Sequence, residues 1–245
     1  MNSFQERIKK LARQKSPLIL ANDYDDHKNL ESRTLKNIKT LSDSLCAIKF
    51  NFHLLLPLGE KQILSITKIA HSHGLQVIAD IKLNDIGNTN LVAAQTLWNL
   101  GFDCIIVNPM MGPRNLEKLI KLSHQNKKGV ISLCHMSSPE AKVTYELDVK
   151  LGSKNTQLYK LFLDWATKMS ADGIIVGATF PDIIQYCKKQ SRGKLNIFSP
   201  GIGTQGGDIS STVSAGSDYL IVGRTILSSK NPTKTAQEMA LASKN

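Results

Sequence analysis

Short apolar runs recur along the 245-residue sequence and are separated by longer segments whose apolar positions lie three or four residues apart. Runs of four or five mostly apolar residues, rich in β-branched side chains, are typical of strands that are buried on both faces. Segments with the wider spacing predict amphipathic helices. The eight predicted strands span 18–21, 45–48, 77–81, 104–107, 130–133, 173–176, 195–198 and 219–222.

Helical spacing over residues 4–14 predicts a short leading helix, which Pro17 ends. Pro57 is placed to begin another helix, and Gly74 to end it after residue 73. Residues 136–154 show neither spacing and are predicted to be irregular. The remaining predicted helices span 32–42, 90–100, 114–124, 157–169 and 182–190, with a short helix after residue 208 and a last one from about residue 232.

Strands and helices alternate along the whole chain, which predicts an α/β fold with a parallel sheet. One phrase recurs before three of the strands, where an aspartate directly precedes the apolar run: Asp103, Asp172 and Asp218. Repeated units of this kind fit a closed barrel better than an open sheet. We therefore predict a single (βα)8 TIM barrel domain over residues 1–245, with a short N-terminal helix and no second domain.

Such a barrel carries its active site at the carboxyl ends of its strands, and polar side chains gather at those positions here. They are Asp23, Lys49, Asp80, Lys82, Asn108, Ser137, Gln205 and Arg224. Side chains alternate along a strand, so Asp80 and Lys82 are expected on the same face, with Asp85 as a second carboxylate for the same lysine. Alone, Asp-x-Lys is more often a structural ion pair, but the clustering at the strand ends favours catalysis.

Two glycine-containing segments follow the last two predicted strands. Residues 199–208 contain four glycines, enough for a mobile lid or for close approach of the backbone to a ligand. Gly223 and Arg224 follow the eighth strand. Alone, the first segment would be an ordinary flexible connection and Arg224 a surface ion pair. Together they predict a phosphate site, because the loops after strands seven and eight of such barrels often bind phosphate.

The formal net charge of +11 has two interpretations. Many lysines are expected on outer helix faces, where they keep the protein soluble, and a positive field also attracts a small anionic ligand. The basic residues are dispersed, and aromatic residues make up only 6% of the chain. Nucleic-acid binding is therefore the weaker interpretation.

Neither a membrane partner nor a metal is expected from the sequence. No apolar run reaches membrane-spanning length and the polar amino terminus lacks a signal-peptide core, so we expect a cytoplasmic protein. No pair of histidines has metal-ligand spacing, and the cysteines lack Cys-x-x-Cys spacing, so reduced thiols are expected. The cysteines are Cys46, Cys104, Cys134 and Cys187.

Spaced motifs across nearly the whole chain resemble one enzyme family. They are Leu20-Ala21-Asn22-Asp23, Ile48-Lys49, the Asp-x-Lys-x-x-Asp-Ile-x-x-Thr pattern of Asp80, Lys82, Asp85, Ile86 and Thr89, Met136-Ser137, Ser199-Pro200-Gly201 with Gln205-Gly206-Gly207, and Val222-Gly223-Arg224. The set resembles the orotidine 5′-phosphate decarboxylase family in its short, archaeal-type form. Asp-x-Lys-x-x-Asp alone also occurs in related sugar-phosphate enzymes, whereas the spaced set is far more specific.

The resemblance implies decarboxylation of orotidine 5′-monophosphate to uridine 5′-monophosphate, the last step of de novo pyrimidine nucleotide synthesis, with no cofactor. It implies that Lys82 protonates C6 of the pyrimidine, with Asp80 against the departing carboxylate. Asp85, Ile86 and Thr89 would reach the neighbouring subunit's site, so a homodimer is implied. The other implied site residues are Asp23 and Lys49 at the ribose, Ser137 at the pyrimidine edge, Gln205 between base and phosphate, Pro200 and Gly201 in the lid segment, Gly223 and Arg224 at the phosphate, and Ile106, Leu133 and Val176 as an apolar pocket.

Several positions depart from the family's pattern. Gly87 replaces the proline that is usual after Asp-Ile, so the loop that carries Thr89 is expected to be looser. Cys134-His135 stands where archaeal-type relatives often have Thr-Glu, and Ser138 where His is common. These departures affect contacts to the base, and we interpret His135 as a supporting or structural residue rather than a general base.

Two alternatives stay open. A magnesium-dependent sugar-phosphate lyase or synthase of the same superfamily, like 3-hexulose-6-phosphate synthase or 3-keto-gulonate-phosphate decarboxylase, would tend to carry an acidic residue in place of Lys49 and to lack the segment 205–207. A non-catalytic barrel that binds nucleic acid would have no physical reason to keep mutually costly charges at Asp80, Lys82 and Asp85.

Overall fold

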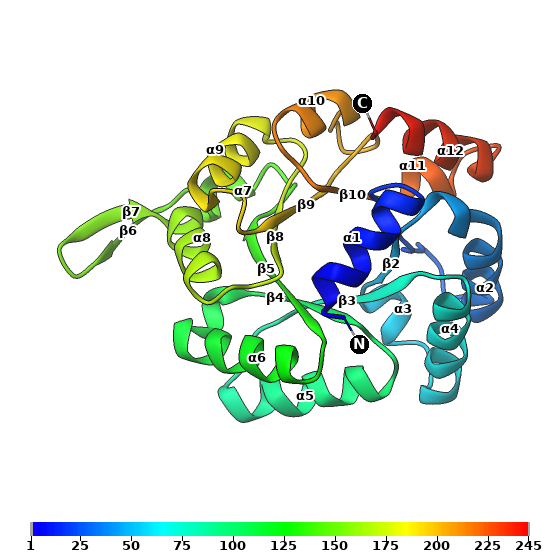
Figure 1. Cartoon of the computed structure of the whole chain (residues 1–245), viewed down its shortest axis with the longest axis horizontal. Helices are drawn as coiled ribbons and strands as arrows, with labels where there is room; N and C mark the ends of the chain where they lie inside the picture. The colour runs from blue at the N-terminus through cyan, green and yellow to red at the C-terminus, as the bar shows by residue number, and fades with distance from the viewer. Residues whose placement is uncertain (1, 245) are drawn as a thin grey trace.

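Eight parallel strands close into a barrel in the computed structural model, which describes residues 2–244. Around the barrel the strands follow the order β1-β10-β9-β8-β5-β4-β3-β2 (Figure 1). They are β1 Leu18–Ala21, β2 Ala47–Phe50, β3 Gln76–Leu83, β4 Cys104–Val107, β5 Gly129–His135, β8 Gly173–Val176, β9 Asn196–Pro200 and β10 Tyr219–Val222. The predicted (βα)8 fold is confirmed, because each apolar run is a strand whose two faces are covered.

Helices surround the barrel and join its strands (Figure 1). The longer ones are α1 Phe4–Gln14, α2 Leu30–Leu41, α4 Glu60–Ser72, α5 Gly87–Asn99, α6 Pro113–Gln125, α8 Leu158–Lys168, α9 Pro181–Ser191 and α12 Pro232–Ala242. The short ones are η1 Ser42–Ser44, α3 Phe52–Leu55, η2 Pro109–Met111, α7 Ala141–Thr144, α10 Ile209–Ser214 and α11 Arg224–Leu227. None of the helices in the described part of the chain has the length and apolar character that a membrane crossing requires.

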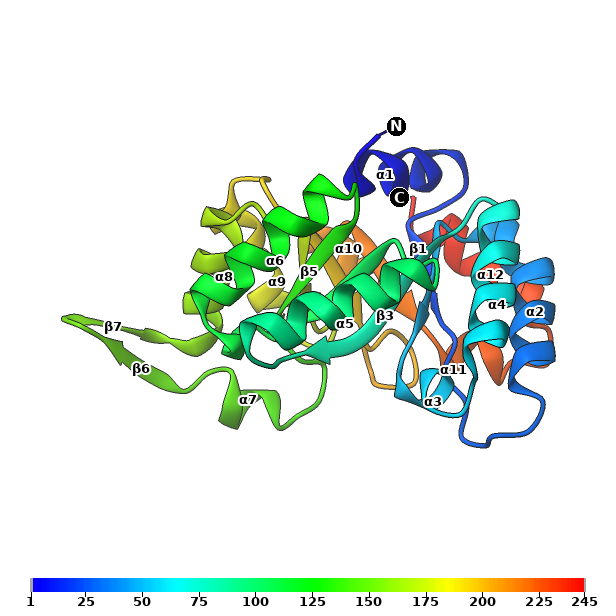
Figure 2. The same ribbon diagram turned by 90° about the horizontal axis from the view of Figure 1, so that it is seen from below.

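Several predicted segments differ from the structure. The strand predicted over 45–48 spans Ala47–Phe50, and the helix predicted from residue 90 begins at Gly87. The helix expected to begin at Pro57 begins at Glu60 instead, because the Gly59 amide donates to the Gln62 side chain (3.0 Å) and caps the helix there. The segment 136–154, predicted to be irregular, contains α7 and most of an antiparallel hairpin, β6 Asp148–Leu151 with β7 Lys154–Gln157. Figure 2 shows the hairpin projecting from the barrel, so β6 and β7 lack the buried face that would have given their sequence a strand pattern.

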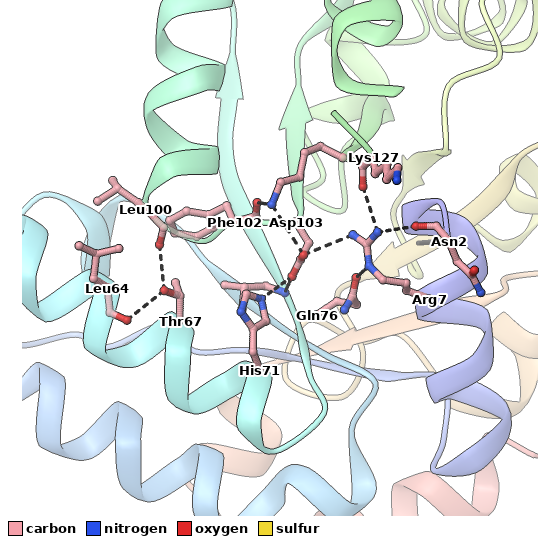
Figure 3. A network of polar contacts seen from close by, with 12 residues as sticks. Asn2, Arg7, Leu64, Thr67, His71, Gln76, Leu100, Phe102, Asp103 and Lys127 are labelled. Carbon is pink, nitrogen blue, oxygen red and sulfur yellow. Dashed lines mark hydrogen bonds and ion pairs between the residues drawn. The ribbon is translucent and has the colours of Figure 1, made fainter. Parts of the chain in front are cut away.

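Helix α1 lies across the amino-terminal end of the barrel, opposite the carboxyl ends of the strands (Figure 2). Phe4 and Ile8 on its inner face are fully buried. A Cβ atom at Gly129 would collide with the Phe4 ring, so the absence of a side chain at Gly129 allows Phe4 of α1 to pack there. Arg7 extends the contact by donating to the Gln76 side chain (2.8 Å) and to Asp103 (3.3 Å), as Figure 3 shows.

The recurrent aspartates form the same set of contacts three times. Each carboxylate accepts the backbone N–H at the start of the neighbouring strand and contacts a basic side chain of the helix that leads into that strand. The sets are Asp103 with Val77 N–H (2.9 Å) and His71 (2.8 Å), Asp172 with Val130 N–H (2.8 Å) and His124 (3.0 Å), and Asp218 with Ile197 N–H (2.8 Å) and Lys188 (2.6 Å). The repeated phrase in the sequence therefore fixes helix and strand positions at the amino-terminal end. Figure 3 shows Asp103 with His71 of the first set.

We predict that His124 stabilises the fold in a pH-dependent way. Its hydrogen bond to Asp172 raises the pKa of His124 above its ordinary value of 6.5, although burial opposes the rise. A raised pKa in the folded state means that the contribution is complete below pH 6.5 and is lost as the pH rises through the folded value. Urea denaturation should therefore find His124→Gln less stable than the native protein near pH 5.5, with a smaller difference near pH 8.5.

His27→Gln, which replaces an exposed histidine, is the matched control and should be as stable as the native protein at both pH values. A His124→Gln deficit that stays the same from acid to alkaline pH would contradict the assignment.

Candidate active site

A buried carboxylate between two ammonium groups forms the centre of the site. Asp80 accepts from Lys49 Nζ through Oδ2 and from Lys82 Nζ through Oδ1, both at 2.8 Å. On the other side of Lys49, Asp23 Oδ1 lies 3.8 Å from the same Nζ atom. The four side chains thus alternate in sign, in the order Asp23, Lys49, Asp80, Lys82, and each inner group has an opposite charge on both sides.

The backbone of β3 brings Asp80 and Lys82 together in a way that simple alternation does not describe. Lys82 has a left-handed backbone conformation, with φ +44°. In the pairing with β4, Asp80 is opposite Ile106 and Leu83 is opposite Val107, so two extra residues are accommodated between them. This bulge turns the end of the strand and directs the Lys82 ammonium back to Asp80. Left-handed lysine is strained by about 1 kcal/mol, which the ion pair helps to offset.

Burial and pairing act in opposite directions on the two central groups. Lys49 and Asp80 have side chains that are 5% and 11% exposed. Burial alone would lower the pKa of Lys49, but the Asp80 and Asp23 carboxylates outweigh it and raise that pKa. Burial would raise the pKa of Asp80, but Lys49 and Lys82 together lower it. Both groups are therefore held in their charged forms at neutral pH.

These charges line a cavity of about 440 Å³ at the carboxyl ends of the strands. Twelve of the residues predicted from the sequence lie on its wall: Asp23, Lys49, Asp80, Lys82, Ile106, Leu133, Ser137, Pro200, Gly201, Gln205, Gly223 and Arg224. Ile106 and Leu133 give one side of the cavity an apolar surface next to the charges. The size and the mixed lining are typical of a small-molecule site.

One residue predicted for the apolar wall is misplaced. Ile175 lines the cavity in place of Val176, which is fully buried and absent from the wall. The register explains the error, because Leu133 of the wall pairs with Ile175, and the pairing shifts before His135 meets Val176. Counting along the sequence could not reveal this shift.

Asp85, Ile86 and Thr89 lie outside this cavity and are exposed in the single chain. The interpretation of Asp85 as a second carboxylate for Lys82 of its own chain is wrong: its carboxylate instead accepts the Ile86 N–H (2.6 Å). Thr89 lies in the first turn of α5 and not in the loop predicted from the sequence. Asn90 fixes the backbone of Asp85 through two hydrogen bonds, of 3.0 and 2.7 Å.

The segment after β9 is folded back on itself and tied to α11. Gly201, Gly203 and Gly206 all have positive φ, and the Gly207 N–H donates to the Gly201 carbonyl (2.9 Å). Thr225 of α11 donates to the carbonyl of Ile202 (3.1 Å). These contacts place Gln205 and Arg224 on the wall of one cavity, although Gln205 follows β9 and Arg224 follows β10.

Sequence reasoning missed several residues of the wall. They are Asp25, Asn51, His53, Ile175, Ile202, Thr204 and Ile221. Asn51 follows β2 directly, and its side chain accepts the His53 N–H (2.9 Å) to start α3. Its position directly after a strand was a signal in the sequence that could have identified Asn51 as a residue of the site. Within residues 2–244, no group of three His, Cys, Asp or Glu side chains is arranged to hold a metal ion.

The arrangement is suited to stabilising negative charge next to an apolar surface. Two ammonium groups approach the same carboxylate, and the Lys82 side chain remains 41% exposed toward the cavity. Asp23 Oδ1 is buried and has no hydrogen-bond partner among the described residues. A buried carboxylate oxygen without a donor is costly, so a ligand hydroxyl at this position would stabilise it.

We expect Asp80→Asn to destabilise the protein, because it leaves Lys49 buried with only the more distant Asp23. Removing one partner of a buried pair costs about 3 kcal/mol in the free energy of unfolding. Asp85→Asn is the matched control, since it changes an exposed carboxylate and should alter that free energy by less than about 0.5 kcal/mol. Equal stabilities of the two variants in urea would show that Asp80 does not sustain the buried lysine.

Comparisons with known proteins identify the family of the chain. A model of the family described as "Orotidine 5'-phosphate decarboxylase / HUMPS family" matches residues 16–239. The orotidine 5′-phosphate decarboxylase of Pyrococcus abyssi is 33% identical over 91% of this chain and 96% of its own length. That of Methanosarcina barkeri is 31% identical over 92% of this chain and 94% of its own.

A solved structure is similar over almost the same extent. The crystal structure of orotidine 5′-monophosphate decarboxylase from Methanocaldococcus jannaschii, complexed with the inhibitor BMP, has a TM-score of 0.78 and 29% sequence identity. The match covers 93% of this chain and 98% of that one. Family model, relatives and fold agree: the chain is a carboxy-lyase and belongs to the orotidine 5′-phosphate decarboxylase / HUMPS family.

Proposed function

We propose that the protein decarboxylates orotidine 5′-monophosphate to uridine 5′-monophosphate without a cofactor, and that Lys82 is the acid. The observation that carries the proposal is the shared carboxylate, in which Asp80 contacts both Lys49 and Lys82 at 2.8 Å at the wall of the cavity. The relatives at more than 30% identity bear the name of this activity.

Loss of carbon dioxide from C6 leaves an sp² carbanion with little delocalisation. An ammonium group fixed where this charge develops stabilises the transition state more than the ground state. The Lys82 ammonium then gives its proton to C6, and the product carries a C6–H bond. Asp80 keeps this ammonium in place, so positioning and charge stabilisation depend on the same ion pair.

Asp80 also has a direct effect on the substrate. At about 3 Å, with an effective dielectric constant near 20, its carboxylate would repel the substrate carboxylate by about 5 kcal/mol. Departure of carbon dioxide relieves this repulsion. Stabilisation of the carbanion by Lys82 is the principal contribution in our proposal, because it acts on the charge that the reaction creates.

Groups far from C6 would bind and orient the nucleotide. Arg224 can contact the phosphate in a bidentate manner, and Gln205 reaches the same cavity from the segment after β9. Asp23 Oδ1, which has no hydrogen-bond partner among the described residues, is suited to a ribose hydroxyl. Ser137 also lies on the cavity wall and would contact the pyrimidine. Binding energy from the phosphate would then hold the reacting carbon against Lys82.

We also propose that the active form is a homodimer in which Asp85, Ile86 and Thr89 complete the neighbouring subunit's site. Large apolar side chains are exposed after three adjacent strands, which is typical of a surface that another chain covers. They are Phe52 and Leu56 after β2, Ile86 and Val92 after β3, and Met110 after β4. Asp85 adjoins this surface on a backbone that Asn90 holds in place.

Turnover without metal is the direct test of the reaction. The absorbance of orotidine 5′-monophosphate should fall when metal-free native protein is added in EDTA. Lys82→Ala should lower kcat/KM by about a thousandfold or more while remaining folded. Lys142→Ala removes an exposed lysine outside the cavity and should keep native activity. Activity that requires added Mg²⁺ and a sugar phosphate would instead identify the sugar-phosphate branch of the superfamily.

Mixing two inactive variants tests the shared site. Lys82→Ala and Asp85→Asn should each be nearly inactive, but a re-associated mixture should recover about a quarter of native activity, because half of the dimers then carry one intact site. A mixture of Lys82→Ala with Asp80→Asn is the control and should stay inactive, since both residues belong to the same subunit's part of the site. No recovery in the first mixture would contradict the shared arrangement.

A further inference from the structure

His135 is a buried titratable residue that the proposed reaction does not use. It ends β5, is 0% exposed, and packs against the rings of Phe180 (4.5 Å between centroids), Tyr145 (5.8 Å) and Tyr159 (5.9 Å). Both ring nitrogens still have polar partners. Nδ1 lies 2.9 Å from the carbonyl oxygen of Met136, and Nε2 lies 3.3 Å from Glu146 Oε1.

The loop held by this ring forms part of the cavity wall. Met136 and Ser137 both line the cavity, and Ser137 lies against Gly201, where an added Cβ would come within 2.9 Å of the serine Cβ. A Cβ at Gly177 would collide with the Ser137 backbone. Thr179 donates to the Ser137 carbonyl (2.9 Å). The Met136–Ser137 loop thus has little free space. Thr179 binds its Ser137 carbonyl, and the His135 ring contacts its Met136 carbonyl.

Glu146 connects this loop to the insertion that contains α7 and the β6–β7 hairpin. Its backbone carbonyl accepts from the Gln157 side chain (3.3 Å), and the neighbouring carbonyl of Tyr145 accepts the Tyr159 N–H of α8 (2.8 Å). The backbone of Glu146 is therefore anchored on the helix side. Its carboxylate reaches the ring that supports the cavity loop, so His135 is the link between the insertion and the cavity.

The contacts of the His135 ring with Met136 and Glu146 determine which of its two nitrogens must carry a hydrogen. A backbone carbonyl only accepts, so Nδ1 must carry a hydrogen. An ionised carboxylate also only accepts, so a hydrogen bond to Glu146 requires a second hydrogen on Nε2. Both contacts form together when His135 is an imidazolium. In the neutral ring the Nε2 lone pair faces the Glu146 oxygen, and that contact opens.

We propose that His135 is a positioning residue whose protonation, relayed by its contact with Glu146, fixes the Met136–Ser137 loop and tightens binding at the pyrimidine end of the cavity. This inference rests on the proposed function, because it assumes that Ser137 contacts the pyrimidine base. It assigns His135 no contact with the substrate. Affinity for the nucleotide should therefore depend on pH through a group behind the cavity wall.

The groups around the ring leave this titration to His135. Burial raises the pKa of Tyr145 to about 12 and that of Tyr159 further. Contact with Cys187 and burial raise the pKa of the Cys134 thiol well above its ordinary value. The nearby cations are Lys142, over the Phe180 ring, and Lys160, over the Tyr159 ring. Burial lowers the pKa of His135 itself, against the opposing contacts with Met136 and Glu146, so the ring gains its proton below pH 6.5.

The first test compares KM for orotidine 5′-monophosphate between about pH 5.5 and 8 in the native protein and Glu146→Gln. Loss of one hydrogen bond should raise the native KM by about fivefold as His135 loses its proton, with little change in kcat. The side-chain amide introduced by Glu146→Gln can donate to the Nε2 atom of a neutral ring, so the variant's KM should stay nearly constant over this range. Glu140→Gln, an exposed change in the same insertion, is the control and should keep the native profile.

A second variant separates the two contacts of the ring. His135→Asn retains a donor for the Met136 carbonyl but is too short to reach Glu146, so its KM should stay at the high-pH value of the native protein at every pH. A native-like pH profile in either His135→Asn or Glu146→Gln would overturn the proposal, because the titration would then come from another group.

An NMR titration of the ligand-free protein provides a readout that does not depend on turnover. The Cε1–H signal of His135 and the amide signal of Ser137 should titrate with the same midpoint, and Glu146→Gln should move both midpoints to lower pH. Unchanged midpoints, or a Ser137 amide that does not follow the ring, would overturn the proposal. Absence of turnover with coupled midpoints would contradict the proposed reaction but not the role of His135.

Discussion

The interaction on which the site depends is the sharing of one buried carboxylate by two ammonium groups. Asp80 has an oxygen for each lysine, at 2.8 Å, in an interior where an unpaired charge would be costly. Lys49 is almost fully enclosed, whereas Lys82 keeps a surface toward the cavity. The same carboxylate therefore stabilises a structural cation on one side and positions a reactive cation on the other.

The barrel makes this arrangement possible because it fixes three neighbouring strands in register. Asp23 follows β1, whereas Lys49 lies within β2 and Asp80 within β3, and these side chains meet because the three strands pair in register. At the opposite end, helix α1 and the three aspartate sets hold the strands and helices against one another. The contacts that stabilise the fold thus lie at the amino-terminal ends of the strands, whereas the buried charges of the site lie toward their carboxyl ends.

The sequence predicted most of the fold because its signals are strong and local. Eight continuous apolar runs could only be doubly covered strands, and the polar residues after them had to meet at one edge of a parallel barrel. Features set by register or by single torsions were not predictable in this way. The left-handed Lys82, the position of Ile175 on the cavity wall and the projecting hairpin all depend on contacts between distant segments or on the absence of a buried face. The outward position of Asp85 likewise depends on its tie to Asn90.

The central claim is that Asp80 acts on the reaction through Lys82 and that the two form one unit. The most direct test is a double-mutant cycle in kcat/KM for orotidine 5′-monophosphate, with Asp80→Asn, Lys82→Ala and the combined variant. Residues that act as a unit give strongly non-additive losses, so the combined variant should be no worse than about Lys82→Ala alone. If the losses of the two single variants multiply in the combined variant, Asp80 and Lys82 act independently and the account is wrong.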